Sequence, residues 1–217
     1  MKVKNFPFAI SIDGFGAGPR QSINDPMGVR GGELHQWLYA TEAFKKSVAL
    51  PWGTDVVTKN VDHRFIEKAF SNVGAWIMGR NMFSPVRGPW PDESWKGWWN
   101  ENPPFHCDVF VLTHHPRRSI KMAGDTTFHF VTDGIESALK KAKEAAKDKD
   151  VCIGGGISTI QQYLKARLID EFHVAVTPLL FGEGENLFSN INLVELGMTP
   201  AEWALGEGAM HVVLKKT

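Results

Sequence analysis

The sequence predicts an α/β fold with a mostly parallel central sheet and an antiparallel C-terminal hairpin. Through the middle of the chain, short apolar runs typical of strands alternate with amphipathic segments typical of helices. Near the C-terminus this alternation ends in two strand-like runs joined by Gly206-Glu207-Gly208, which suits a hairpin turn. The sequence contains no internal repeat and no low-complexity linker, so we expect residues 1–217 to form one domain.

The first half of the chain predicts a buried strand, two helices, and a second strand that leads into a short helix. The helix at 61–72 is well marked, because Phe65, Ile66 and Ala69 share one face and charged residues occupy the other. Segment 85–104 holds five prolines and is expected to be irregular. The expected ranges are 6–12 for the first strand, 33–45 and 61–72 for the helices, 75–78 for the second strand and 79 onward for the short helix.

The second half continues the alternation of strands and helices. Asp133 and Glu136 predict a capping box at the start of one helix, and Ala138 and Leu139 belong to its apolar stripe. The expected ranges are 109–113, 127–131, 151–153, 171–177 and 210–214 for strands, with helices from 135 and from 157.

A run of three glycines is the first candidate site. It joins a predicted strand to a predicted helix, so backbone N–H groups and the positive end of the helix dipole can receive a phosphate. The pattern is not G-x-G-x-x-G, because Thr159 stands at the position of the third glycine. A tight turn without a ligand is the alternative. The candidate residues are Gly154, Gly155, Gly156, Ile157 and Ser158.

The end of the 75–78 strand is a second candidate phosphate-binding turn. It leads into Gly79, Arg80, Asn81 and Met82, again a glycine followed by a helix start. The Arg80 guanidinium carries a fixed charge and a fork of donors suited to phosphate. A solvated arginine is the alternative interpretation.

The end of the 109–113 strand offers a third site of this kind. Thr113 and His114 supply a hydroxyl and an imidazole, and Arg117 and Arg118 follow closely. Ligands of parallel α/β sheets bind at the carboxyl ends of the strands, so three such ends favour one extended phosphate-bearing ligand. A solvated basic loop is the alternative.

Asp13 is a candidate for chemistry rather than for phosphate binding. It ends the first predicted strand and precedes a glycine-rich loop, so its carboxylate can orient or protonate a substrate. The alternative is a turn in which Asp13 accepts hydrogen bonds from nearby backbone.

Composition and charge exclude several classes of protein. Lysine plus arginine and aspartate plus glutamate both number 24, so bulk attraction to nucleic acid or anionic lipid is not expected. The two cysteines, Cys107 and Cys152, have neither disulfide-scaffold nor metal-ligand spacing, and no metal is expected. No segment has the apolar length of a signal peptide or membrane span. We therefore expect a cytoplasmic protein without nucleic-acid or membrane partners.

Taken together, these residues resemble the dihydrofolate reductase-like superfamily. In particular, the chain is similar to stand-alone relatives of the C-terminal reductase domain of the bifunctional riboflavin-biosynthesis deaminase-reductase. The resemblance covers nearly the whole chain. It rests on SIDGF at 11–15, GGELHQW at 31–37, MGRNMF at 78–83, VLTHH at 111–115, IGGG at 153–156, LIDE at 168–171 and PLLFG at 178–182.

This resemblance implies a three-layer fold and NADPH as hydride donor. It places the cofactor pyrophosphate between the Gly79-Arg80 turn and the turn at 154–156, and the adenosine 2′-phosphate near Thr113 and His114. The nicotinamide is expected beside Asp13. The resemblance also implies a homodimer. The deaminase motifs H-x-E and P-C-x-x-C do not occur in the sequence, so only a reductase reaction is expected.

The expected reaction is reduction of a small heterocyclic, carbonyl or imine substrate. Glu33, His35 and Trp37, together with the tryptophan-rich loop at 90–99, are expected to shape the substrate pocket, and plain hydrophobic packing is their alternative. A dihydrofolate or pterin reductase remains open, with Asp55 after Leu50-Pro51-Trp52 as its substrate-binding acid. A non-catalytic nucleotide-binding module also remains open.

Overall fold

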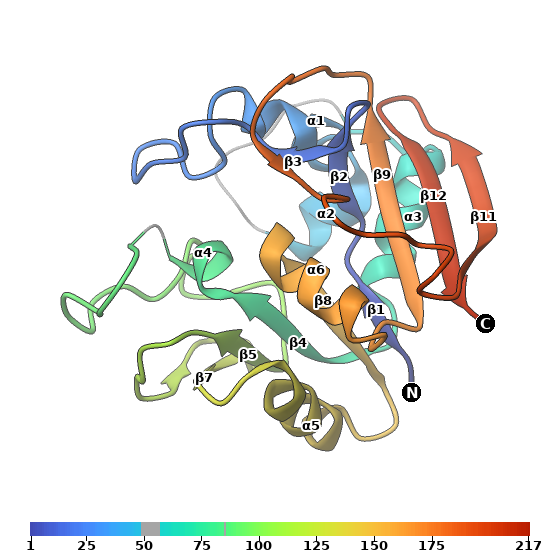
Figure 1. The fold of residues 1–217 in the computed structure, drawn as a ribbon. Coiled ribbons are helices and arrows are strands. Elements are labelled where there is room, and N and C mark those ends of the chain that lie inside the picture. Colours follow the sequence, from blue (N-terminus) through green and yellow to red (C-terminus); the bar gives the residue numbers. More distant parts are fainter. Residues whose placement is uncertain (49–56, 85) are drawn as a thin grey trace.

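The computed structural model describes residues 1–48, 57–84 and 86–217, and it confirms the predicted α/β class (Figure 1). Within these residues, ten strands form one sheet in the order β11-β12-β9-β1-β8-β4-β5-β7-β6, with β2 also paired to β9. The strands are β1 (Val3–Asn5), β2 (Phe8–Ser11), β4 (Val73–Gly79), β5 (Asp108–Leu112), β6 (Ile120–Lys121), β7 (Thr127–Val131), β8 (Asp150–Gly155), β9 (Glu171–Thr177), β11 (Met198–Leu205) and β12 (Met210–Lys216).

The pairing is parallel through the middle of this sheet and antiparallel at both ends. From β1 through β8, β4 and β5 to β7, each strand pairs in parallel with the next, and β9 pairs in parallel with β1 and β2. β11 and β12 pair antiparallel with each other, which confirms the predicted C-terminal hairpin. β12 is also antiparallel to β9, and β6 is antiparallel to β7. A small second sheet pairs β3 (Phe15–Ala17) with β10 (Glu185–Asn186).

Helices and an aromatic cluster cover the two faces of the sheet. The helices are η1 (Gly31–His35), α1 (Gln36–Tyr39), α2 (Glu42–Ser47), α3 (Val61–Phe70), α4 (Arg80–Phe83), α5 (Ile135–Ala146) and α6 (Ile157–Lys165). None of the helices in the described ranges is long and apolar enough to cross a membrane.

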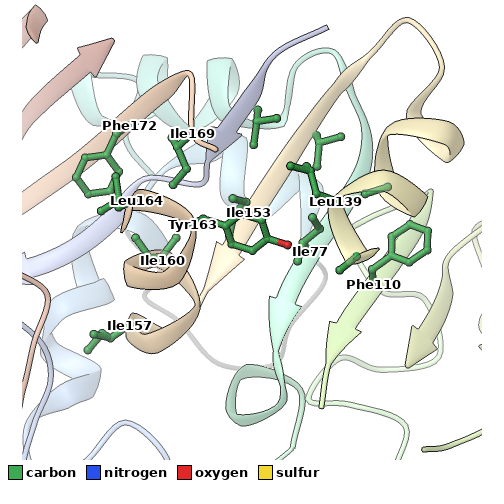
Figure 2. Packing of buried hydrophobic residues seen from close by; sticks show 14 of the residues in the cluster. Ile77, Phe110, Leu139, Ile153, Ile157, Ile160, Tyr163, Leu164, Ile169 and Phe172 are labelled. Carbon is green, nitrogen blue, oxygen red and sulfur yellow. The ribbon is translucent and has the colours of Figure 1, made fainter. Parts of the chain in front are cut away.

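One face of the central strands packs against α5 and α6 (Figure 2). Ile77 of β4 and Ile153 of β8 are completely buried there, between side chains of the two helices. The Tyr163 hydroxyl of α6 donates a 2.8 Å hydrogen bond to the Ile135 carbonyl, so the two helices are joined directly. Each such isoleucine contributes roughly 1.5–3 kcal/mol by burial.

The opposite face of these strands packs against the tryptophan-rich segment. Trp90, Trp95 and Trp99 pack against a core that includes Trp76 and Phe128. Two indole N–H groups also anchor the segment, because Trp95 donates to the Phe83 carbonyl at 2.8 Å and Trp90 to the His115 carbonyl at 3.0 Å. The segment lacks regular structure in its described residues, as expected, and most of its tryptophans serve as packing groups.

Two of the expected elements differ in the structure. The strand expected at 6–12 is shorter, because β2 begins only at Phe8, and Phe6-Pro7 separates it from β1, which was not predicted; proline cannot donate to a sheet ladder. The helix expected at 33–45 is three short helices. Thr41 interrupts it: its hydroxyl donates to the Leu38 carbonyl at 2.8 Å and accepts from the Phe44 N–H, which makes it the N-cap of α2.

The capping box predicted at Asp133 and Glu136 is wrong. The N-cap of α5 is Gly134, with φ +95°, and it makes no side-chain capping bond. This turn leaves the Asp133 carboxylate beside the first helical turn, where it accepts from the Ser137 hydroxyl at 2.7 Å. The short strands β3, β6 and β10 were not predicted, because two or three residues carry no periodicity.

A buried polar chain connects α3 to the C-terminal hairpin. Asp62 accepts from the Glu207 and Gly208 N–H groups at 3.1 and 3.0 Å, and its other oxygen lies 2.8 Å from Nε2 of His211. Nδ1 of His211 lies 3.0 Å from Nε2 of His173 on β9. Burial and the neighbouring His211 lower the pKa of His173 to about 3.

This chain predicts a loss of stability in mild acid. Between about pH 6.5 and pH 3 the unfolded state binds a proton at His173 that the folded state does not. The free energy of unfolding should therefore fall as the pH drops through this window, by at most about 1.4 kcal/mol per unit for one proton. Urea unfolding at pH 7, 6 and 5 measures this slope.

The control for this prediction is a comparison of two histidine variants. His173→Gln should reduce the slope, whereas His106→Asn, at an exposed position, should leave it unchanged. An unaltered slope in His173→Gln would contradict the assignment.

Candidate functional site

Three strand ends singled out in the sequence lie side by side. In the parallel register Gly79 at the end of β4 is opposite Leu112 of β5, and Met78 is opposite Gly155 of β8. The register between β4 and β8 shifts between Ile77 and Met78, just before these strand ends. The turns that lead into α4 and α6 therefore open at the same edge of the sheet (Figure 1).

A cleft of about 1320 Å³ lies at this edge. Its volume exceeds the ~300–1,000 Å³ usual for a pocket that holds one small molecule. All of the cofactor residues predicted from the sequence line it, namely Gly79, Arg80, Asn81, Met82, Thr113, His114, Gly154, Gly155, Gly156, Ile157 and Ser158. The fold therefore brings the three predicted strand-end segments to one cavity.

The glycine turn after β8 presents bare backbone to this cleft. Gly155 has φ +136°, a conformation that favours glycine, and an added Cβ on Gly156 would meet no atom within 4 Å. Gly156 is the N-cap of α6 and makes no side-chain capping bond, so the first N–H groups of the helix are open to a ligand. Gly79 has a packing role, because an added Cβ would collide with the Thr159 hydroxyl of α6.

Two arginines share one indole ring next to the end of β5. The Arg80 guanidinium carbon lies 3.0 Å from the centre of the Trp90 ring, and that of Arg117 lies 4.7 Å from it. Nη1 of Arg80 also donates to the Thr113 hydroxyl at 3.3 Å. Since Trp90 is itself bonded to the His115 carbonyl, the ring holds both cations against this strand end.

Several N–H groups of Arg80 and Arg117 lack a hydrogen-bond acceptor among the described residues. Nε and Nη2 of Arg80 and Nη1 of Arg117 are buried and have no hydrogen-bond partner among the described residues. Burial, followed by the charge of Arg117, lowers the pKa of Arg80 to about 10, so it stays protonated at neutral pH. Buried charged donors without partners are costly, and a bound phosphate would satisfy them.

Asp13 lies outside the residues that line the cleft. Its carboxylate accepts from the Gly182 N–H at 2.7 Å, from the Phe181 N–H at 3.1 Å and from the Ser11 hydroxyl at 2.5 Å. The Ser11 hydrogen bond is the main cause that lowers the pKa of Asp13. This geometry anchors the loop after β9, which the alternative of a local turn did not predict, and the catalytic role of Asp13 stays a prediction.

The three predicted substrate residues are separated by the fold. His35 lines the cleft, and its Nδ1 is buried without a hydrogen-bond partner. Burial lowers the pKa of His35, which keeps the imidazole neutral. Glu33 pairs with Arg30 at 2.9 Å away from the cleft, and Trp37 is buried against His211. These two do not share a pocket with His35, because the short helices turn them to other sides.

Sequence patterns did not predict the aromatic wall of the cleft. Phe6, Phe70, Trp76 and Phe105 line it and contact one another, with ring centres 5.2–5.6 Å apart in three of the pairs. They come from four separate segments, so no local periodicity marks them. Asp55, the acid of the pterin alternative, lies outside the described residues.

Within the described ranges, no group of three or more histidine, cysteine, aspartate or glutamate side chains could hold a metal ion. The groups that line the cleft are instead backbone at the glycine turn, the Arg80 guanidinium, the neutral His35 imidazole and aromatic rings, and Arg117 lies behind this lining on the Trp90 ring.

Comparisons with known proteins identify the family and the fold of the chain. The family model described as the RibD C-terminal domain matches residues 5–211. YyaP, an uncharacterized protein of Bacillus subtilis (strain 168), is 28% identical over 96 residues, or 42% of this chain. That match spans 50% of YyaP, about half of its length.

Solved structures share the fold along the whole chain. A protein from Shewanella sp. PV-4 named for riboflavin biosynthesis is 22% identical, with a TM-score of 0.60, and covers 100% of this chain and 99% of its own. A diaminohydroxyphosphoribosylaminopyrimidine deaminase/5-amino-6-(5-phosphoribosylamino)uracil reductase from Thermotoga maritima is 14% identical, with a TM-score of 0.56. This second match covers 100% of the present chain and 57% of the Thermotoga chain.

The contacts of Asp13 predict a stabilising role. Asp13→Ala removes the acceptor of two backbone N–H groups, which should lower the free energy of unfolding by about 1–3 kcal/mol. Asp133→Ala removes an exposed carboxylate and should cost less, about 0.5 kcal/mol or below. Urea unfolding measures both. An Asp13→Ala protein as stable as wild type that fails to oxidise bound cofactor would support the catalytic role instead.

Proposed function

Because this chain belongs to the RibD C-terminal domain family, we propose that it is an NADPH-dependent reductase of a small planar substrate. The proposed NADPH site is the cleft at the ends of β8, β4 and β5, where NADPH would supply the hydride. The observation that carries the proposal is the Arg80–Trp90–Arg117 cluster, with its buried and unpartnered guanidinium N–H groups. The free thiols of Cys107 and Cys152 fit the cytoplasmic location that we also propose.

Different groups of the chain suit different parts of the proposed cofactor. The open N–H groups at the start of α6 and the bare backbone at Gly156 suit a pyrophosphate. Arg80, Thr113 and Arg117 suit a further phosphate at the end of β5. NADPH carries such a group as its 2′-phosphate and NADH does not, so this cluster is the proposed source of cofactor preference.

The aromatic side of the cleft suits a flat and weakly charged substrate. The wall formed by Phe6, Phe70, Trp76 and Phe105 offers stacking surface. His35 is the polar group beside it, and its neutral imidazole can hydrogen-bond a ring nitrogen or carbonyl through Nδ1. A heterocycle, carbonyl or imine compound is the proposed class of substrate.

Cofactor preference gives the first test of this function. We expect NADPH to bind, with calorimetry showing tighter binding than for NADH. Arg80→Gln and Arg117→Gln should each weaken NADPH about 10- to 100-fold, since a hydrogen bond to a charged group contributes about 1.5–3 kcal/mol. NADH affinity should change much less.

Arg118→Gln is the matched control, because Arg118 is exposed and adjacent in the sequence. It should bind NADPH as the wild type does. Failure of the wild type to bind NADPH would refute the proposed function, and equal losses for NADPH and NADH would refute the role of the two arginines.

Substrate turnover gives the second test. Oxidation of NADPH, followed by its absorbance, is measured across carbonyl compounds, imines and planar heterocycles, including the uracil compound named for the Thermotoga reductase. With an accepted substrate, His35→Gln should lower kcat/KM about 10- to 100-fold and leave NADPH affinity unchanged. Gln36→Ala, at the exposed neighbouring position, is the control. NADPH binding without oxidation across the panel would favour the non-catalytic module.

A further inference from the structure

The aromatic wall of the cleft continues beyond its four residues. Phe6 contacts Phe70 and Trp76, and Trp76 contacts Phe105, with ring centres 5.2–5.6 Å apart. The ring of Trp99 extends this series, because its centre lies 4.7 Å from that of Phe105. All five rings line the cleft, so the surface available for stacking spans several rings.

The wall begins beside the glycine turn that suits the cofactor pyrophosphate. An added Cβ on Gly154 would lie 3.5 Å from the Trp76 side chain and 3.1 Å from that of Met82. The Trp76 ring thus packs directly against the turn from which α6 starts. A substrate on the wall and a cofactor at this turn would be neighbours in one cleft.

The cleft offers few positive charges to a substrate. Of the described residues that line it, the lysine or arginine residues are Arg80 and Arg87. Arg80 is stacked on Trp90 beside the end of β5, where the proposed cofactor phosphate binds. Arg87 is exposed, and its Nη2 donates to the Gln21 side chain at 3.4 Å. A single arginine in solvent holds an anion only weakly.

Lys4 lies on the same face of the sheet as the wall, but its ammonium is already engaged. Lys4 of β1 is opposite Cys152 of β8, which is opposite Trp76 of β4, so these side chains share one face. The ammonium donates to two carbonyls at the C-terminal end of α3, at 2.9 and 3.3 Å, and lies 3.8 Å from the Asp150 carboxylate. Lys4 does not line the cleft.

A phosphate on the substrate would therefore be poorly accommodated at the wall. Residues 49–56 and 85, outside the described ranges, contain no lysine or arginine. The polar group beside the wall is His35, and burial lowers its pKa, so the imidazole carries no charge. A phosphate at this side of the cleft would lose water without gaining a cation, and an unpaired buried charge is costly.

A flat ring without a phosphate suits the same surroundings, because it stacks on the rings and needs no cation. We propose that the substrate of this protein is a planar compound without a phosphate group, held by the aromatic wall. The Thermotoga maritima reductase is named for a phosphoribosyl compound, so this chain would differ from it in that requirement. The inference rests on the proposed reductase function and narrows the class of its substrate.

A matched pair of compounds tests the proposal. One is the 5-amino-6-(5-phosphoribosylamino)uracil named for the Thermotoga reductase, and the other is the same compound with its phosphate removed. Binding to the full chain is followed by quenching of tryptophan fluorescence, with saturating NADP⁺ present to occupy the proposed phosphate sites. The dephosphorylated compound should bind at least as tightly as the phosphorylated one, because the wall offers the phosphate no charged partner.

Variants of the wall locate the binding site. Phe70→Leu removes one ring and should weaken binding of the dephosphorylated compound about 10-fold, since stacking on that ring is lost. Trp99→Leu gives a second measurement on the same surface. Phe188→Leu is the matched control, because Phe188 is also half-buried but does not line the cleft, and it should bind as the wild type does. Thermal unfolding of each variant checks that it is folded.

Three outcomes would overturn the proposal. One is binding of the phosphorylated compound about 10-fold or more tightly than its partner. Another is an Arg87→Gln variant that loses only the phosphorylated compound, because Arg87 would then recognise the phosphate. The third is a wild type that binds NADP⁺ but neither compound. Failure of NADP⁺ itself to bind, measured separately by calorimetry, would contradict the reductase function and remove the basis of this inference with it.

Discussion

β4 is hydrogen-bonded to β8 on one side and to β5 on the other. These hydrogen bonds align the carboxyl ends of the three strands at one edge of the sheet. The predicted cofactor-binding residues of the cleft depend on this alignment. Parallel pairing puts the three carboxyl ends at the same edge, and β4 and β8 each lead directly into the start of a helix there. If one strand slipped by a residue, its buried isoleucine or valine would face the opposite side, so burial on both faces fixes the register.

The two faces contribute differently to the site. On one face, α5 and α6 bury Ile77 and Ile153 and set the direction from which α6 points at the cleft. On the other face, the tryptophan-rich segment fills the core beside Trp76 and Phe128. The tryptophan-rich segment also does more than fill the core, because the two arginines stack on Trp90. Trp90 therefore both packs against the core and positions the two arginines.

Local patterns predicted the elements that have length and periodicity. α3, α5, α6, β7 and β9 lie where apolar spacing placed them, and the glycine turns correctly indicated which strand ends face the cleft. The sequence could not indicate the break at Thr41, since a hydroxyl that bonds backbone in both directions looks the same as any helical threonine. It also could not indicate that Asp13 would be engaged by backbone about 170 residues away, or that four separated aromatic residues would form one wall.

The hydrogen bond from Trp90 to the His115 carbonyl has a consequence for selectivity. An arginine free in solvent must give up its rotamer freedom when a ligand arrives, at a cost of roughly 0.5–1.5 kcal/mol for each side chain immobilised. Arg80 has lost that freedom already, because the fixed indole and the Thr113 hydroxyl hold its planar fork in one orientation. A rigid fork accepts an anion only if its oxygens match the spacing of the donors. Under the proposed function, the tryptophan-rich segment would therefore act as a template that favours a tetrahedral group of the right size over a negative charge in general.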